Sequence, residues 1–378
     1  MKIFTLKENL KEGLNLVGHI AGKNQNLPIL NNVMIDVKDK GIKLITTNLE
    51  IGMVHTIRGK VEEEGEFTVG AKMIADYINL LPNKQITITK KDDNIQVECE
   101  NYKTKIKGQS TDDFPLIPTV DKEKEFVADV DQFKKALSKV VFAVSSGESR
   151  LELSGVVFIF GKNNLTMAAT DSYRLAEKEV EIETKNPSME GQKIIIPAKT
   201  LQELIRVLAG TKDENIKEKN QEKINFFISE NQVMFTFKNT ELISKTIEGQ
   251  YPDYKQIIPN ETKTSAVVNR DEFIRAVKTS SLFSKTGVND VNLDFPKGGG
   301  KMVVSSASGD AGENVVDVEA ETSGEDNGIV INYNYLLDGL NHINEENVKI
   351  EVIDNNTPCI IKPLEEKKYL YIIMPIKQ

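Results

Sequence analysis

One pattern occurs three times along the chain, and this repeat restricts its fold more than any other feature. Three stretches each predict a strand followed by a helix with one apolar face: IFTLKENLKEGLNLV (3–17), EFVADVDQFKKALSKVV (125–141) and SAVVNRDEFIRAVKTSS (265–281). Apolar residues recur at i, i+3 and i+4 in each stretch, which is typical of a helix that buries one side. Aligning Leu10, Phe133 and Phe273 also aligns the small residues Gly13, Ala136 and Ala276.

A second set of three strand–helix stretches alternates with the first set. FTVGAKMIADYINLL (67–81), IIIPAKTLQELIRVL (194–208) and IVINYNYLLDGLNHI (329–343) align without a gap. Their apolar positions coincide, and so do the acidic residues Asp76, Glu203 and Asp338. Two sets that match in the same order indicate an internal repeat of a whole structural unit.

The segments between these helices predict antiparallel strands. Short alternating runs rich in β-branched residues, with Asn and Gly at the turns, fill them, and FPKGGGKMVVSS (295–306) predicts a hairpin. We therefore expect an α+β fold in which each unit packs two helices on antiparallel sheets. Pro-containing links at 112–123 and 251–262 place the domains at 1–120, 121–255 and 256–378. The charged segment 211–223 predicts a solvated loop.

Composition narrows the class of protein. At 378 residues the chain is long for one core. No apolar run reaches the roughly 18 residues that a bilayer requires, and the N-terminal stretch has no continuous hydrophobic region. With no such segment, we expect no membrane partner. Cys99 and Cys359 are too few for a disulfide framework, so we expect a protein of the reducing cytoplasm. The net charge of −9 argues against indiscriminate nucleic-acid binding but leaves room for a local basic face.

No segment carries a recognisable catalytic or metal-binding motif. GGGKM (298–302) lacks the first Gly and the final Ser or Thr of a phosphate loop. His19, His55 and His342 are on unrelated segments, so we predict no metal and no cofactor. The polar cluster at 170–174 is the one candidate for an active site between units, and it has no histidine beside it. One alternative to a binding protein is a repeat enzyme with its active site at this cluster. A second alternative is a monomeric scaffold that binds peptides and does not bind DNA.

Positive charge recurs on the predicted helices although the chain is acidic. Lys135 and Lys139 follow the polar side of one helix, and Arg275 and Lys278 lie on the matching helix of the third unit. Lysine on an exposed helix face is usually simple solvation. Recurrence of the same sign on equivalent helices instead favours a basic lining that contacts a phosphate backbone without reading bases.

Six segments, in order, resemble signatures of the bacterial DNA polymerase III beta subunit, the DNA sliding clamp. They are LPILNNVMIDV (27–37), TTNLEIGM (46–53), ATDSYRLA (169–176), YPDYKQIIP (251–259), LLDGL (336–340) and YIIMPIKQ (371–378). The resemblance covers the whole chain. It implies three clamp domains per chain, a head-to-tail homodimer closed into a ring around duplex DNA, and no catalysis. The implied partners are the polymerase III catalytic subunit, the clamp loader and other proteins with a clamp-binding motif.

The resemblance also implies three sets of site residues. The peptide-binding set is Leu153, Thr170, Ser172, Tyr173, Arg174, Leu175, Pro252, Gln256, Ile257, Val288, Asn332, Tyr335, Pro358, Ile372, Met374, Pro375, Ile376, Lys377 and Gln378. The DNA-binding set is Lys23, Asn24, Lys135, Lys139, Lys199, Arg206, Arg275 and Lys278. The dimer-interface set is Ile78, Ile106, Leu282 and Phe283, with ordinary core positions as the alternative. Gln256, Val288 and the Lys377–Gln378 end depart from common family residues, which leaves the preferred client motif open.

Overall fold

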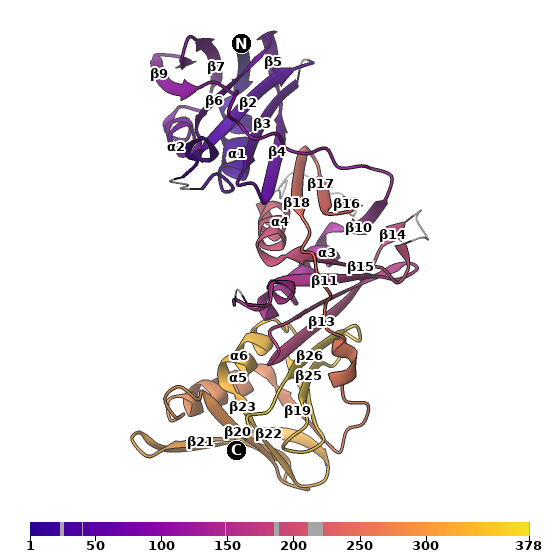
Figure 1. Ribbon diagram of the computed structural model, residues 1–378. Coiled ribbons are helices and arrows are strands. Elements are labelled where there is room, and N and C mark those ends of the chain that lie inside the picture. Colours follow the sequence, from indigo (N-terminus) through magenta and orange to yellow (C-terminus); the bar gives the residue numbers. More distant parts are fainter. Residues whose placement is uncertain (23–25, 40, 148, 185–188, 211–221, 378) are drawn as a thin grey trace. The chain divides into compact units, whose positions relative to one another are not determined.

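The computed structural model describes residues 1–22, 26–39, 41–147, 149–184, 189–210 and 222–377. The chain separates into two compact units. Many of their helices and strands are labelled in Figure 1. The first contains the described residues of the ranges 1–130, 184–186 and 206–246, and the second contains those of 131–183, 187–205 and 247–378. The middle repeat contributes to both units. Its described residues in 121–130 and 206–246 belong to the first unit, and those in 131–183 and 187–205 belong to the second.

The first unit is built on one large antiparallel sheet. Its strands run in the order β14-β10-β16-β17-β18-β4-β3-β2-β6-β9-β8-β7-β1-β5. Two helices, α1 (Lys7–Val17) and α2 (Ala71–Leu80), pack against each other in this unit. The strands are β1 (Lys2–Leu6), β2 (Asn32–Lys38), β3 (Gly41–Thr47), β4 (Ile51–Ile57), β5 (Gly59–Glu63), β6 (Gly65–Gly70), β7 (Gln85–Lys91), β8 (Asn94–Cys99), β9 (Tyr102–Gln109), β10 (Glu125–Asp129), β14 (Glu183–Thr184), β16 (Lys223–Ile228), β17 (Gln232–Phe237) and β18 (Thr240–Lys245).

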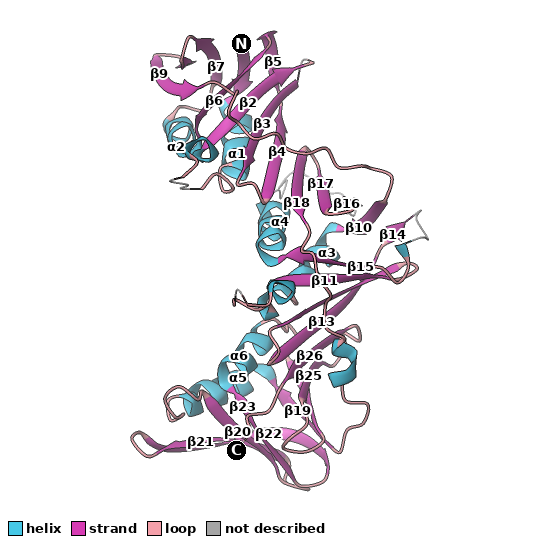
Figure 2. Ribbon diagram, in the orientation of Figure 1, coloured by secondary structure: helices cyan, strands magenta, loops and turns pink. Residues whose placement is uncertain are grey.

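The second unit is also an antiparallel sheet with helices against it (Figure 2). Its strand order is β15-β11-β12-β13-β26-β25-β24-β19-β22-β21-β20-β23. The helices are α3 (Val130–Ser138), α4 (Ala198–Gly210, whose residues from Arg206 belong to the first unit), α5 (Arg270–Ser281) and α6 (Tyr333–Asn341). The strands are β11 (Gly155–Phe160), β12 (Asn164–Thr170), β13 (Arg174–Glu181), β15 (Lys193–Pro197), β19 (Thr264–Asn269), β20 (Asp290–Phe295), β21 (Lys301–Ser308), β22 (Gly312–Gly324), β23 (Asn327–Asn332), β24 (Asn347–Val352), β25 (Cys359–Pro363) and β26 (Tyr369–Ile373).

The six predicted strand–helix stretches are confirmed. The strands β1, β6, β10, β15, β19 and β23 lead directly into α1, α2, α3, α4, α5 and α6, respectively. Asn side chains begin two of these helices: Asn269 accepts from two backbone N–H groups of α5, and Asn332 accepts from one of α6. Such caps satisfy N–H groups that have no partner within the helix. The predicted hairpin at 295–306 is confirmed as β20–β21, whereas 211–221 lies outside the described residues.

The alignment of the three repeats also agrees with the core of the structure. Leu10, Phe133 and Phe273 are each 0% exposed, so the aligned positions are the buried centres of their helices. A Cβ added at Gly13 would lie 2.7 Å from Ile57 and less than 3 Å from two more side chains. The repeat therefore keeps a small residue at this position because the helix lies close to its sheet there.

Gly339 provides a test of how tightly α6 packs. A Cβ at this position would lie 2.2 Å from Cε1 and 2.3 Å from Cδ1 of Tyr371, whose ring is 0% exposed. We expect Gly339→Ala to lower the free energy of unfolding by about 1–3 kcal/mol, the usual cost of overpacking a core. This loss opposes the gain of about 1 kcal/mol that alanine brings to a helix interior. Urea unfolding measures the difference.

Gly210→Ala is the matched control, because a Cβ at Gly210, the last residue of α4, meets nothing within 4 Å. We expect this variant to be as stable as the parent chain. A Gly339→Ala protein more stable than the parent chain would show that the added methyl group fits beside Tyr371 without a packing cost.

Candidate functional site

The polar cluster at 170–174 forms a tight turn between β12 and β13. Thr170 Oγ1 donates to the carbonyl of Arg174 (2.6 Å) and accepts from the N–H of Ser172 (3.1 Å). Asp171 Oδ1 accepts from the N–H groups of Tyr173 (2.9 Å) and Arg174 (3.0 Å). Ser172 has a φ of 79°, which is uncommon for a residue other than glycine. The threonine and the aspartate are therefore occupied in shaping the backbone.

The first repeat contains the same turn between β3 and β4. Thr47 Oγ1 donates to the carbonyl of Ile51 (3.0 Å) and accepts from the N–H of Leu49 (3.1 Å). Asn48 Oδ1 accepts from the N–H groups of Glu50 (3.0 Å) and Ile51 (2.8 Å), and Leu49 has a φ of 76°. The turn is thus a shared element of the repeat. What distinguishes the second copy is the pair of side chains that replaces Glu50 and Ile51.

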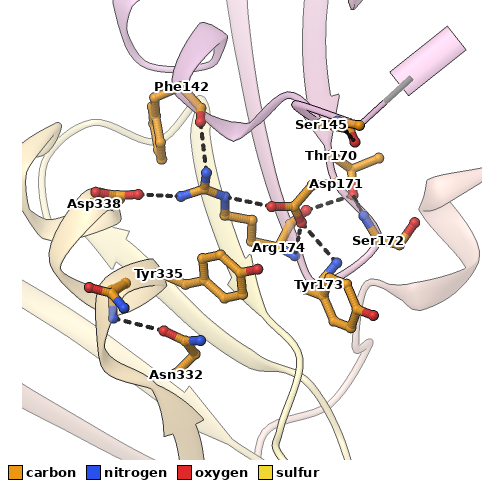
Figure 3. A network of polar contacts seen from close by, with 12 residues as sticks. Phe142, Ser145, Thr170, Asp171, Ser172, Tyr173, Arg174, Asn332, Tyr335 and Asp338 are labelled. Atoms are coloured by element: carbon orange, nitrogen blue, oxygen red, sulfur yellow. Dashed lines mark hydrogen bonds and ion pairs between the residues drawn. The ribbon is translucent and has the colours of Figure 1, made fainter. Parts of the chain in front are cut away.

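One of these side chains, Arg174, is held by three partners inside the second unit (Figure 3). Its Nε donates to Asp171 Oδ2 (3.0 Å), Nη1 donates to Asp338 Oδ2 of α6, and Nη2 donates to the carbonyl of Phe142 (3.0 Å). The arginine side chain is 11% exposed. A planar guanidinium with a fixed fork of donors suits such a fixed set of acceptors.

Aromatic rings lie on the arginine and beside it. The guanidinium carbon is 4.7 Å from the ring centroid of Tyr335 and 5.6 Å from that of Phe142, which are cation–π distances. Tyr335 in turn stacks on Tyr173, with centroids 6.4 Å apart and planes 17° apart. Tyr173 is 63% exposed, so this pair presents an aromatic wall to solvent. We call Arg174, Asp171, Asp338, Phe142 and Tyr335 the Arg174 network.

Buried groups support the network from behind. The Tyr371 hydroxyl donates to the carbonyl of Tyr335 (2.7 Å), and burial raises the pKa of the Tyr371 phenol well above its usual value. The phenol therefore remains a donor at neutral pH. His342, next to the end of α6, stacks on Phe142 with centroids 4.0 Å apart, and its Nδ1 lies 2.7 Å from the carbonyl of Asp338. These contacts tie α6 to the segment that carries Phe142.

The C-terminal segment runs past the turn. The N–H of Met374 donates to the carbonyl of Tyr173 (2.8 Å), and the N–H of Ile376 donates to the carbonyl of Val330 in β23 (2.8 Å). Met374, Pro375 and Ile376 are half-buried and Lys377 is exposed. The turn and the tail are therefore neighbours, as the resemblance implied, while Gln378 lies outside the described residues.

Three predicted apolar contacts lie in the core. Leu153, Leu175 and Ile372 are 1%, 0% and 0% exposed and pack in a cluster with Tyr251 and Tyr254, two tyrosines of the 251–262 link. A role for these side chains in a peptide site stays a prediction.

The remaining predicted peptide residues are spread over the second unit. Thr170 is buried, Ser172 and Tyr173 are exposed, and Asn332 is half-buried with its side chain capping α6. The rest are half-buried or exposed, namely Pro252, Gln256, Ile257, Val288 and Pro358. Among the described residues, no hydrogen bond, ion pair or ring contact joins this last group to the turn. The contacts that do form gather the turn, Tyr335 and the tail.

Four of the predicted DNA-binding side chains are exposed and belong to helices α3, α4 and α5. They are Lys135, Lys199, Arg275 and Lys278. None of the four forms an ion pair with a described residue. Arg206 is half-buried and donates to the carbonyl of Leu16 in α1 (2.6 Å), and Lys23 and Asn24 lie outside the described residues.

Lys139 is a correction to the DNA-binding set. The side chain is only 9% exposed, pairs with Glu366 and places its Nζ 5.1 Å from the ring centroid of Tyr369. The helix α3 ends at Ser138, so Lys139 follows the chain away from the helical face on which the prediction placed it. A cation held in this way is not available to a phosphate.

The interface set divides in the same manner. Ile78 is 0% exposed in the core of α2, so its expected position on a subunit surface is wrong for the side chain. Ile106 and Phe283 are half-buried, and Leu282, directly after α5, is 74% exposed. These three positions stay predictions.

Phe142 of the Arg174 network, and His342 that stacks on it, were not recognised from the sequence as site residues. Asp338 was noticed only as a recurring acidic position. Its partner Arg174 is 164 positions away in the chain, and no local pattern connects the two. His55 lies 2.8 Å from Thr240 Oγ1, and burial lowers its pKa below the ordinary value.

Metal-binding clusters and membrane-spanning helices are absent from the described part of the chain. Within those residues, no group of three or more His, Cys, Asp or Glu side chains is arranged to hold a metal ion. No described helix combines the length and the apolar character needed to cross a membrane. Cys99 and Cys359 are both buried free thiols.

Comparison with known proteins matches the chain from end to end. Three models of the DNA polymerase III beta subunit match it in order: the N-terminal domain at 1–118, the central domain at 128–253 and the C-terminal domain at 255–377. Relatives named beta sliding clamp from Synechocystis and Staphylococcus epidermidis are each 28% identical, over 100% of this chain and 99% and 100% of their own lengths.

Solved structures agree with these relatives. The DNA polymerase III beta subunit of Thermotoga maritima has a TM-score of 0.90 at 28% identity, covering 100% of this chain and 99% of its own. The DNA polymerase sliding clamp of Bacillus subtilis has a TM-score of 0.91 at 25% identity, with the same coverage. With three family domains matched in order and the same fold throughout, the chain belongs to the DNA polymerase III beta subunit family.

Proposed function

We propose that this chain is a DNA sliding clamp, a processivity factor that encircles duplex DNA and tethers the replicative polymerase to it. The observation that carries the proposal is the match to all three beta-subunit domains, consecutive and in order along the chain. The domains would be 1–120, 121–255 and 256–378. Two chains would close head to tail into a ring.

An exposed apolar residue supports the ring. Leu282 is 74% exposed at the end of α5, and Phe283 beside it is half-buried. In a head-to-tail dimer these residues of the third domain would meet the first domain of the partner, where Ile106 is half-buried on β9. Covering a large apolar side chain of this kind favours association.

The basic helices support contact with DNA. Exposed lysine and arginine side chains without ion-pair partners among the described residues can meet phosphates, which carry no sequence information. Weak contacts of this kind suit a ring, because the closed ring holds the DNA and the contacts can exchange as it slides.

The turn and the tail support capture of client peptides. The exposed Tyr173 ring, the Tyr335 ring and the backbone of 374–377 give an aromatic wall beside an extended segment, a combination suited to short peptides. Clients would be the polymerase III catalytic subunit, the clamp loader and other proteins with a clamp-binding motif. The protein would act in the cytoplasm and would have no catalysis of its own. Thr170 and Asp171 support a non-catalytic role for the polar cluster, because both side chains bond to the backbone of the turn.

Retention on DNA tests the ring directly. We expect the purified protein, once loaded by its clamp loader, to stay on a nicked circular plasmid through gel filtration and to leave the same plasmid after linearisation. Solution mass should correspond to two chains. Equal retention on circle and linear DNA would overturn topological binding, and a particle of one chain of 42.3 kDa would favour a monomeric scaffold.

Replacing exposed basic residues should change the salt dependence of DNA binding. We expect Lys135→Ala with Arg275→Ala to weaken DNA binding and to flatten the slope of log K against log salt by about 0.9 for each phosphate that the variant no longer neutralises. The solution mass should not change, since neither side chain packs in the core. Fluorescence anisotropy of a labelled duplex at several salt concentrations gives the slope.

The control for this pair is Lys162→Ala with Lys297→Ala, two exposed lysines in turns between strands. The control should keep the parent slope. If both pairs change the slope equally, the helices do not form the DNA-binding face.

Peptide capture should depend on the exposed aromatic and on the tail. A synthetic peptide with the clamp-binding motif of the polymerase III catalytic subunit and one added tryptophan is a clean probe, because this chain has no tryptophan. We expect Tyr173→Ala, and separately a chain that ends at Ile373, to weaken its binding about tenfold or more, as loss of an interface anchor does. Val315→Ala, which removes an equally exposed apolar side chain from β22, should bind as the parent does. Unchanged affinity in either test variant would place the site elsewhere.

A further inference from the structure

The Arg174 guanidinium faces the protein interior. Nε, Nη1 and Nη2 each donate to a protein acceptor, and two aromatic rings lie within cation–π distance of the group. With 11% of the side chain exposed, little of it can reach a ligand. Three of the five N–H groups of the guanidinium thus donate to acceptors inside the protein, which leaves few donors for a ligand carboxylate or carbonyl.

The surface that a ligand can reach is aromatic. Tyr335 lies between the guanidinium at 4.7 Å and the Tyr173 ring at 6.4 Å, so the cation, the inner ring and the outer ring form a sequence from the interior to solvent. Burial raises the pKa of Tyr335, which keeps its phenol uncharged. The arginine therefore fixes the position of the ring on which the exposed tyrosine stacks.

Asp338 and Phe142 hold the arginine by its two terminal nitrogens. The carboxylate of Asp338 pairs with Nη1, while its backbone carbonyl lies 2.7 Å from His342 Nδ1. The carbonyl of Phe142 accepts from Nη2 at 3.0 Å, and its ring stacks on the same histidine at 4.0 Å. Each residue is thus tied both to the guanidinium and to His342, which restricts where Arg174 can lie.

The first repeat shows the turn without this arrangement. Ile51 occupies the position of Arg174 in a turn with the same hydrogen bonds, and its side chain is 3% exposed. The backbone shape therefore does not require an arginine. The charged centre and its partners are an addition to the turn that the first repeat does not carry.

Resting on the peptide-capture function proposed above, we infer that Asp338 and Phe142 are positioning residues of the peptide site. They hold Arg174 so that it supports the wall made by Tyr335 and Tyr173, and a bound peptide contacts that wall through a large apolar or aromatic side chain. Arg174 acts through the rings and does not itself bind the peptide.

Replacing Asp338 distinguishes the two possible roles of Arg174, support of the aromatic wall and direct binding of the peptide, because they change peptide affinity in different directions. If Arg174 bound the peptide, Asp338→Ala would release a donor to it and affinity would stay the same or increase. If Asp338 positions the wall, the same change weakens binding. We expect Asp338→Ala to bind the tryptophan-labelled peptide about tenfold less tightly, a factor within the range of one hydrogen bond to a charged group. Asp338→Asn, which keeps an acceptor oxygen, should recover most of the affinity.

A double-substitution cycle with Tyr173 distinguishes positioning from general damage. Tyr173 is largely exposed, so Tyr173→Ala removes the wall without opening the core. In that background we expect Asp338→Ala to cause little further loss of affinity, because both changes act on the same part of the site. A full additional loss would overturn the inference, as would a single Asp338→Ala variant that binds like the parent or more tightly.

Asp76→Ala is the matched control, since Asp76 occupies the equivalent position of α2 and is exposed. It should leave peptide affinity unchanged, and thermal unfolding should show each variant folded. Should Asp338→Ala fail to fold, Asp338→Asn in the same cycle carries the test, with a smaller loss that again disappears in the Tyr173→Ala background. If the parent protein binds no peptide, the proposed peptide capture fails and this inference with it. If the parent binds and Asp338→Ala binds equally well, only the positioning role fails.

Discussion

Burial of one apolar helix face against an antiparallel sheet is the interaction on which the rest of this structure depends. The centres of that face, Leu10, Phe133 and Phe273, are fully buried in all three repeats. Because each helix commits one side to its sheet, the other side is free to carry charge without disturbing the fold. The exposed basic residues of α3, α4 and α5 occupy that free side. Packing of one helix face against a sheet therefore explains both the repeated core and the freedom of the opposite face to vary.

The turns show how copies of one element can take different roles. Residues 47–51 and 170–174 share their side-chain-to-backbone hydrogen bonds and a positive φ at the third position. In the first copy the last position is a buried isoleucine. In the second it is an arginine that joins the turn to α6 and to Phe142. The turn supplies geometry in both places, and the side chains alone determine whether a further network forms.

Local periodicity predicted the fold well, and the site less well. Helix faces and strand–helix order follow from nearest-neighbour spacing, so all six helices were found where predicted. Lys139 was misplaced because α3 ends one residue earlier, and helix ends are the least certain feature of a periodic pattern. The burial of Leu153, Leu175 and Ile372 could not be predicted from local spacing, because it depends on packing with Tyr251 and Tyr254 in one cluster. The pairing of Arg174 with Asp338 could not be predicted, since no spacing rule reaches across 164 positions.

The enclosed position of Arg174 also limits how this surface can change under selection. A molecule that binds to the exposed faces of Tyr173 and Tyr335 touches rings whose position depends on groups buried behind them. Substitution of the arginine would leave the Asp171 carboxylate, whose side chain is 13% exposed, without its charged partner, and removal of one member of a buried pair is costly. Resistance to an inhibitor at this wall would therefore have to arise at the exposed rings or the tail, where the same changes would impair any natural ligand that uses them.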